Sequence, residues 1–84
     1  MTLSQLEVGQ IAKVIKVRSE NAERRRMLDI GILPGTVIET VMRSPLGDPV
    51  AYRVRDAVVA LRREQAELIE VQSVAQETQM EMKR

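Results

Sequence analysis

The chain has 84 residues, enough for one domain, and its 44% hydrophobic and 30% charged residues are typical of a globular protein. It contains neither Cys nor His, which excludes the usual sites for zinc, haem, iron–sulfur clusters and copper, as well as Cys-based and Ser-His catalysis. The net charge is +1, and one Tyr is the only aromatic residue, which excludes a platform that stacks successive nucleic-acid bases.

Neither a secretion signal nor a membrane span is visible in the sequence. Residues 1–10 lack the basic and apolar regions of a signal peptide. The longest uncharged stretch of the apolar region, residues 30–38, is far shorter than the roughly 20 residues that cross a membrane. We therefore expect a cytoplasmic binding domain that has no catalytic residues, holds no cofactor and does not insert into the membrane.

The N-terminal part of the chain predicts one helical turn followed by a strand. Ser4 and Glu7 have the spacing of a capping box, and Gly9 follows too soon for a long helix, so we expect a single turn that closes one end of the core. Residues 10–17 are rich in β-branched side chains and predict a strand. Their alternation is irregular, which indicates either that both faces are covered or that a bulge shifts the register.

Residues 19–30 predict the clearest helix of the chain. Ser19 or Asn21 is a candidate N-terminal cap, and Gly31 is the residue type that commonly follows a helix in left-handed conformation. The apolar residues around this helix end are expected in the core: Leu28, Ile30, Ile32 and Leu33.

The middle of the chain predicts three further strands. Residues 37–42 form the first, and residues 44–49, which include two prolines and a glycine, predict a shaped loop after it. Residues 50–54 alternate between apolar and other side chains, as in a half-buried strand. A short connection, residues 55–57, then leads to residues 58–62, so the two segments predict a hairpin.

The segment after Arg63 is ambiguous. Ile69 and Val71 alternate as in a strand, whereas Leu68 and Val71 also fit a helical stripe. We expect a strand over about residues 67–72. The whole pattern then predicts a mainly β fold: a small barrel of about five strands with one short helix between the first two, and with Val54, Leu61 and Ile69 inside.

The charged residues leave several functions open. Eight arginines could form a basic surface that binds nucleic acid or an acidic partner, or they could be an ordinary arginine-rich exterior. Glu64, Glu67 and Glu70 recur at a spacing of three and would share one face of a helix, but we expect them to form a solvated acidic edge. Asp48 is expected to cap a turn. The arginines are Arg24, Arg25, Arg26, Arg43, Arg53, Arg55, Arg62 and Arg63.

Three blocks of sequence, taken in order and spacing, resemble the FeoA family. They cover residues 26–36, 45–49 and 59–62 and read RMLDIGILPGT, PLGDP and VALR. The resemblance extends over residues 3–71 and implies an SH3-like barrel whose last segment is a strand. It also places Asp56 where many FeoA relatives have Gly at the hairpin turn, and Asp tolerates the left-handed geometry expected there. We therefore expect a FeoA-like domain over residues 1–73 and a flexible or weakly helical tail over residues 74–84.

The FeoA resemblance also implies a function. The family consists of small cytoplasmic proteins of bacterial ferrous-iron uptake, and its partner is FeoB, a membrane permease with a cytoplasmic GTP-binding domain. Related domains occur in metal-dependent repressors, and the family is often described as transition-metal binding. The implied role is regulatory or structural and not enzymatic.

We therefore expect a surface that binds the cytoplasmic domain of the permease. Leu46, at the tip of a proline-bounded loop, either folds back onto the barrel or anchors this partner. The alternatives are a module that binds or senses transition metal through carboxylates, and a small basic barrel that binds nucleic acid. The expected partner-binding residues are Arg25, Arg26, Pro45, Leu46, Gly47 and Asp48.

Overall fold

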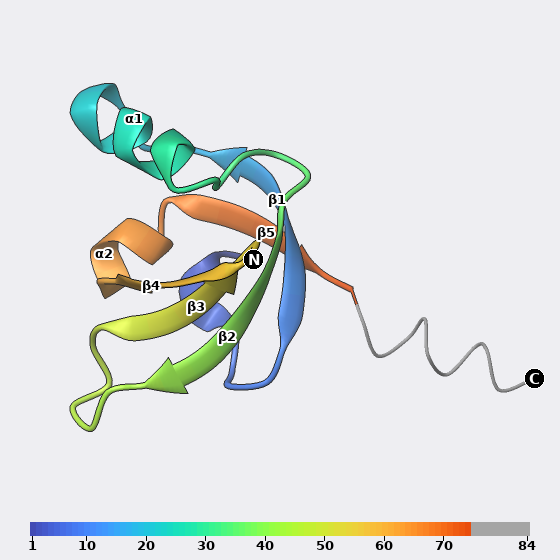
Figure 1. The fold of residues 1–84 in the computed structure, drawn as a ribbon, viewed down its shortest axis with the longest axis vertical. Coiled ribbons are helices and arrows are strands. Elements are labelled where there is room, and N and C mark those ends of the chain that lie inside the picture. The colour runs from blue at the N-terminus through green and yellow to red at the C-terminus, as the bar shows by residue number, and fades with distance from the viewer. Residues whose placement is uncertain (75–84) are drawn as a thin grey trace, which may run out of the picture.

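The computed structural model describes residues 1–74, so the predicted tail lies, apart from Val74, outside the described residues. Five strands bend around a common core, and the longer helix covers one end (Figure 1). This arrangement confirms the predicted mainly β fold. In chain order the elements are η1 (Leu3–Gln5), β1 (Ile11–Val17), α1 (Asn21–Asp29), β2 (Val37–Arg43), β3 (Val50–Val54), β4 (Ala57–Leu61), α2 (Arg63–Ala66) and β5 (Ile69–Ser73).

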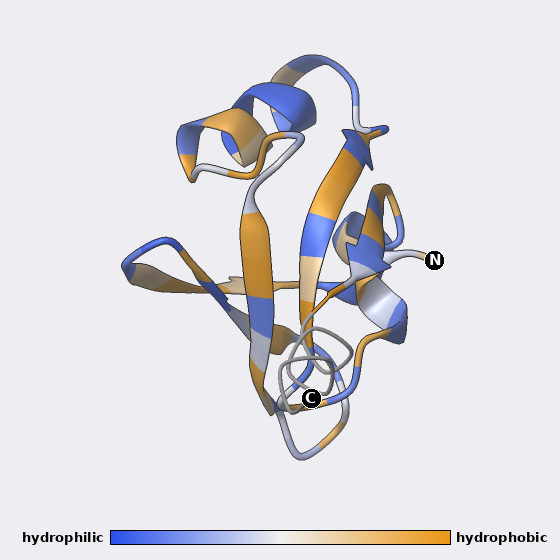
Figure 2. Cartoon of the chain, turned by 90° about the vertical axis from the view of Figure 1, so that its right-hand side faces the viewer, coloured by the Kyte–Doolittle hydropathy of each residue, from blue (hydrophilic) through white to orange (hydrophobic). Residues whose placement is uncertain are grey.

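The strands form one antiparallel sheet in the order β4-β3-β2-β1-β5. The register between β1 and β5 shifts between Val14 and Lys16, so the irregular alternation of β1 reflects a bulge. A second shift lies between Thr40 and Met42, where β2 pairs with β3. Figure 2 shows both hydrophobic and hydrophilic residues along the strands. The alternation is clearest in β3, where every second residue is buried because successive side chains point to opposite faces of a strand.

The core is formed by fifteen buried apolar residues drawn from every element. Val54, Leu61 and Ile69 are each at most 1% exposed, as predicted. The turn η1 closes one end of the core with Leu3 and Leu6. The predicted capping pair was wrong, because the N–H of Thr2 donates to the side chain of Gln5 at 2.7 Å.

Helix α1 ends as its sequence predicts. Gly31 has φ of 98°, and its N–H donates to the carbonyl of Leu28 at 3.0 Å, while the N–H of Ile32 donates to Met27 at 2.9 Å. These two bonds form a Schellman motif, in which Met27 and Ile32 are both fully buried. The position of Leu28 was predicted wrongly: it is 41% exposed, because Met27 takes the inward-facing position of this turn.

The other end of α1 differs from the prediction. The residue before the helix is Glu20, and it makes no side-chain capping bond. Asn21 begins the helix with a positive φ of 57°, and the buried hydroxyl of Ser19 has no hydrogen-bond partner among the described residues. Neither Ser19 nor Asn21 therefore caps the helix. The stability of α1 comes from the packing of Met27 in the core more than from hydrogen bonds at its N-terminus.

The hairpin between β3 and β4 has a two-residue turn, Arg55 and Asp56, because Val54 is paired with Ala57. The left-handed residue of this turn is Arg55, with φ of 59°, and not Asp56. After β4 the chain forms the short helix α2 and then β5, so the ambiguous segment contains both structures. Within residues 1–74 no helix is long and apolar enough to cross a membrane.

Candidate partner-binding site

The loop of residues 44–49 connects β2 to β3 and projects from one end of the barrel (Figure 1). The N–H of Ser44 donates to the carbonyl of Pro49 at 3.2 Å, and the N–H of Gly47 donates to Ser44 at 2.8 Å. Leu46 at its tip is 93% exposed, so it does not fold back onto the barrel. A leucine held in water on a hydrogen-bonded loop is a candidate anchor for a partner.

Asp48 holds this loop to α2. Its Oδ1 accepts a hydrogen bond from the backbone N–H of Arg63, the first residue of α2, at 3.0 Å. An N–H at a helix start has no partner within the helix, and a carboxylate at this position is favoured by the helix dipole. Asp48 therefore shapes the loop and satisfies the start of α2, which agrees with its expected role in a turn.

A polar cavity of about 130 Å³ lies beside the loop. Tyr52 forms part of its wall, and burial raises the pKa of this tyrosine above its ordinary value, an effect that Asp48 increases and Arg43 opposes. The Tyr52 hydroxyl is therefore a neutral donor at physiological pH. Arg43 is held by the carbonyl of Leu6, to which its Nη2 donates at 3.0 Å. The lining residues are Ser4, Arg43, Gly47, Val50, Tyr52, Arg63 and Glu67.

Sequence reasoning missed this cavity because its walls come from η1, the end of β2, β3 and α2, which are far apart in the chain. The only sequence signal was the presence of Arg43 and Arg63 among the arginines. Their guanidinium groups can donate to carboxylates in planar, bidentate geometry. The fold thus places two arginines next to the loop that carries Leu46.

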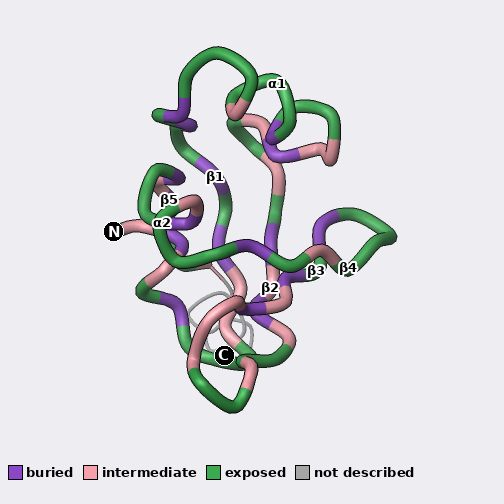
Figure 3. Tube along the Cα trace, turned by 90° about the vertical axis from the view of Figure 1, so that its left-hand side faces the viewer, coloured by how far each residue is buried: buried purple, intermediate pink, exposed green. Residues whose placement is uncertain are grey.

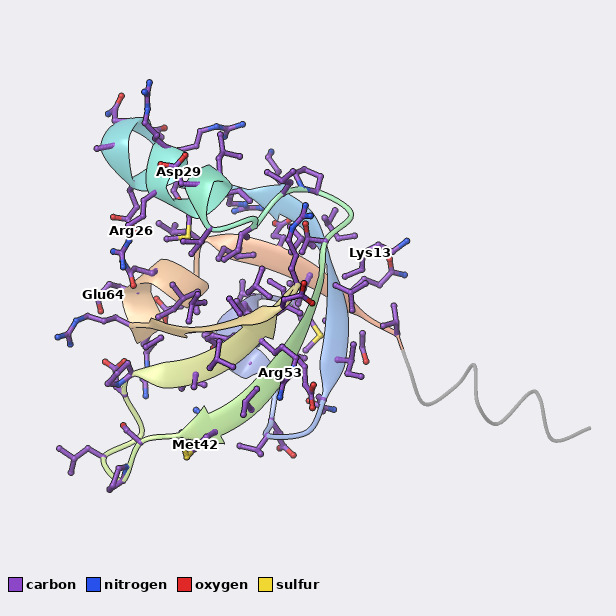
Figure 4. All side chains as sticks on the ribbon, viewed as in Figure 1. Lys13, Arg26, Asp29, Met42, Arg53 and Glu64 are labelled. Atoms are coloured by element: carbon purple, nitrogen blue, oxygen red, sulfur yellow. The ribbon has the colours of Figure 1, made fainter. Side chains whose placement is uncertain are left out.

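Arg25 and Arg26 do not lie with this loop. Both are exposed on α1, which covers the opposite end of the molecule (Figure 1). In Figure 4, Arg26 lies near α2, far from Met42 close to the end of β2. The α1 arginines were expected to form the charged rim of the partner-binding loop. The fold instead places them away from that loop.

Other arginines are engaged in contacts within the domain. Arg53 on β3 is paired with Glu39 on β2 at 3.4 Å, and Arg18 is paired with Glu70 on β5. The Nη1 of Arg24 donates to the carbonyl of Val17 at 3.2 Å. Some arginines of the expected basic surface therefore make contacts within the domain.

The spaced glutamates do not converge. Glu64 lies in α2, Glu67 ends that helix, and Glu70 lies in β5. Among residues 1–74 no three carboxylates gather in a way that could hold a metal ion. The described part of the chain therefore offers no carboxylate cluster for a hard cation.

Comparison with known proteins identifies the family. The FeoA domain matches residues 1–73. The chain belongs to the FeoA domain family. A Fe(2+) transport protein A/Fe(2+) transporter FeoB fusion protein of Porphyromonas gingivalis is 41% identical over 75 residues, which are 89% of this chain and 9% of that protein. The chain thus spans a small part of a much longer relative.

Solved FeoA structures share the fold. The FeoA protein of Chlorobium tepidum is 37% identical and superimposes with a TM-score of 0.84, covering 89% of this chain and 71% of that one. FeoA of Stenotrophomonas maltophilia, an SH3 domain protein crystallised with zinc, is 30% identical with a TM-score of 0.76, covering 86% and 89%. The barrel of this FeoA domain is therefore SH3-like, as the resemblance implied.

Proposed function

We propose that this FeoA domain is a non-enzymatic accessory protein of ferrous-iron uptake, which acts in the cytoplasm by binding the GTP-binding domain of a FeoB-type permease. The fused relative from Porphyromonas gingivalis carries this proposal, because it holds a FeoA part and a FeoB part in one chain. Fusion keeps two binding modules at high effective concentration, which is useful when the modules interact.

The loop of residues 44–49 is the surface that best suits such binding. Leu46 supplies an apolar anchor, and the hydrogen bonds of Ser44 and Asp48 hold the loop in shape before a partner arrives. A preshaped loop loses less conformational entropy on binding. Arg43 and Arg63 beside it can receive acidic side chains of the partner. Together they form an apolar centre with a charged rim.

The direct test measures binding of the full chain to the isolated GTP-binding domain of the permease from the same organism. Calorimetry or surface plasmon resonance should show saturable binding at one site. The membrane-embedded part of the permease, in detergent, is the control for a different docking position. If only the membrane part binds, FeoB is still the partner but its GTP-binding domain is not the docking site.

Reversing one rim charge should slow association. Arg63→Glu removes a positive charge beside the loop but keeps a side chain that suits a helix start, so folding should be unchanged. We expect a several-fold lower association rate at low salt and a smaller difference at high salt, because ions screen this attraction.

The matched control for this variant is Arg25→Glu with Arg26→Glu on α1, the helix that lies away from the loop of residues 44–49. These changes alter the net charge more but should slow association less. A larger effect of the α1 pair than of Arg63→Glu would place the charged rim of the docking surface on α1, where the sequence predicted it beside the loop of residues 45–49.

The described residues, 1–74, do not fit a zinc or ferrous-iron site of ordinary affinity. The chain has no imidazole or thiol, and the carboxylates of residues 1–74 do not converge. We therefore expect calorimetric titrations with Zn²⁺ and Fe²⁺ to show no site tighter than micromolar. A stoichiometric nanomolar site would contradict this expectation and support a metal-sensing role.

A further inference from the structure

The two edge strands of the sheet differ in whether another segment of the chain covers them. At the β5 edge, the N–H of Val71 donates to the carbonyl of Met1 at 2.9 Å, and Thr2 pairs with Glu70 as an isolated antiparallel bridge. The N-terminal residues therefore cover that edge. At the other edge lies β4, which pairs with β3 on one side and with no strand of residues 1–74 on the other.

The register of the hairpin shows which backbone groups of β4 are open. Across a two-residue turn the closing pair, Val54 and Ala57, exchanges both hydrogen bonds, and such pairs then alternate along the ladder. Ala57, Val59 and Leu61 thus bond to β3, whereas the N–H and C=O of Val58 and Ala60 point away from it. Among residues 1–74 none of these four outward groups has a hydrogen-bond partner.

This edge lacks the devices that usually prevent strand pairing. Natural edge strands carry charged side chains or prolines, or are covered. The segment Ala57–Leu61 reads AVVAL, without a charge, a proline or a glycine. Val58 is 53% exposed, and Figure 3 shows the β3–β4 hairpin extending from the rest of the domain with an exposed turn. The edge is suited to adding another strand.

We propose that β4 pairs with β4 of a second copy of this chain, in antiparallel orientation, about a twofold axis at Val59. In this register Val58 lies opposite Ala60 of the second copy, and Ala60 opposite its Val58. Both residues of both copies then use their outward N–H and C=O groups, which forms four hydrogen bonds across the axis. A register centred on Val58 or Ala60 leaves some of these groups unpaired.

Charge complementarity supports a second copy as the occupant. The same register brings Asp56, in the turn just before β4 of one copy, to the end of the ladder where Arg62, just after β4 of the other copy, lies, and the twofold axis repeats this pair. Both residues are exposed, and the backbone of Arg62 is still extended, with φ of −77° and ψ of 158°. Between these charges the facing side chains are small and apolar. The edge is thus complementary to itself, as a twofold interface must be.

The interface is short, so we expect a weak dimer whose population depends on concentration. Sedimentation of the full chain from micromolar to millimolar concentration should show a shift from monomer to dimer. Amide hydrogen exchange, followed by NMR, should slow at Val58 and Ala60 as the concentration rises. Exchange at Val59, which already bonds to β3, is the internal control and should change little.

Charge reversal tests the register. Asp56→Arg and Arg62→Asp each place like charges opposite one another in the dimer, so either single variant should dimerise several-fold more weakly. The double variant restores opposite charges and should recover dimerisation. If a single variant lost dimerisation only because it unfolded, circular dichroism would show the loss of structure, and the double variant would not recover the dimer. A chain that stays monomeric at millimolar concentration, with rapid exchange at Val58 and Ala60, would overturn the proposal.

Discussion

Leu61→Ala is expected to lower the free energy of unfolding by about 2–5 kcal/mol, which is a large part of the stability of so small a domain. Leu61 is 1% exposed at the end of β4, where it faces Val50 across the ladder and precedes α2. Truncation leaves a cavity, because the surrounding strands are hydrogen-bonded and relax only in part. The melting temperature should fall by at least about 10 °C.

Urea and thermal unfolding, followed by circular dichroism, measure this effect. Leu46→Ala is the matched control, since it makes the same chemical change at a side chain that is 93% exposed. That variant should melt within a degree or two of the parent chain. If Leu61→Ala melts at the parent temperature, Leu61 does not occupy the core and the assignment of β4 is wrong.

Leu46→Asp should abolish binding to the GTP-binding domain of the permease while the barrel remains folded. A few buried residues usually supply most of the binding energy of an interface, and Leu46 is the only large apolar side chain on its loop. A carboxylate in its place would have to be desolvated in an apolar pocket of the partner. Because Leu46 is in water in the free domain, the same change costs the fold little.

The measurement is affinity for the isolated partner domain, with the melting temperature as the control for folding. Leu28→Asp is the matched variant, because Leu28 is also an exposed leucine but lies on α1, away from the loop. It should bind like the parent chain. Parent-like affinity in Leu46→Asp would remove the loop from the interface, and unfolding of that variant would show that Leu46 contributes to the core.

Local patterns in the sequence were sufficient for most of the fold. The alternation of β3 and the glycine that ends α1 report interactions between near neighbours, which short segments encode directly. Where two neighbouring residues are both apolar, the sequence does not tell which of them is buried. Met27 and Leu28 are both apolar, and only the packing of α1 on the barrel decides which of them faces inward.

The candidate site was predictable only in part. Residues 44–49 were recognisable because two prolines and a glycine mark a shaped loop. The cavity beside it was not, since Arg43, Tyr52 and Arg63 come from three elements that meet only in the folded barrel. For the same reason the distance between α1 and the loop could not be read from the sequence. Arg25 and Arg26 lie on α1, whereas Arg43 ends β2 beside the loop, although the three are equally basic in the sequence.

Helix α2 links α1 to the loop. It has only four residues, too few to be stable as an isolated helix, so its position depends on what holds it. Asp48 binds its first N–H at 3.0 Å, and Gln65 within it donates to Glu23 of α1 at 2.8 Å. Helix α2 therefore connects the loop to α1 through hydrogen bonds on both sides. A partner that binds the loop and restrains it further would also restrain α1, although it never touches that helix.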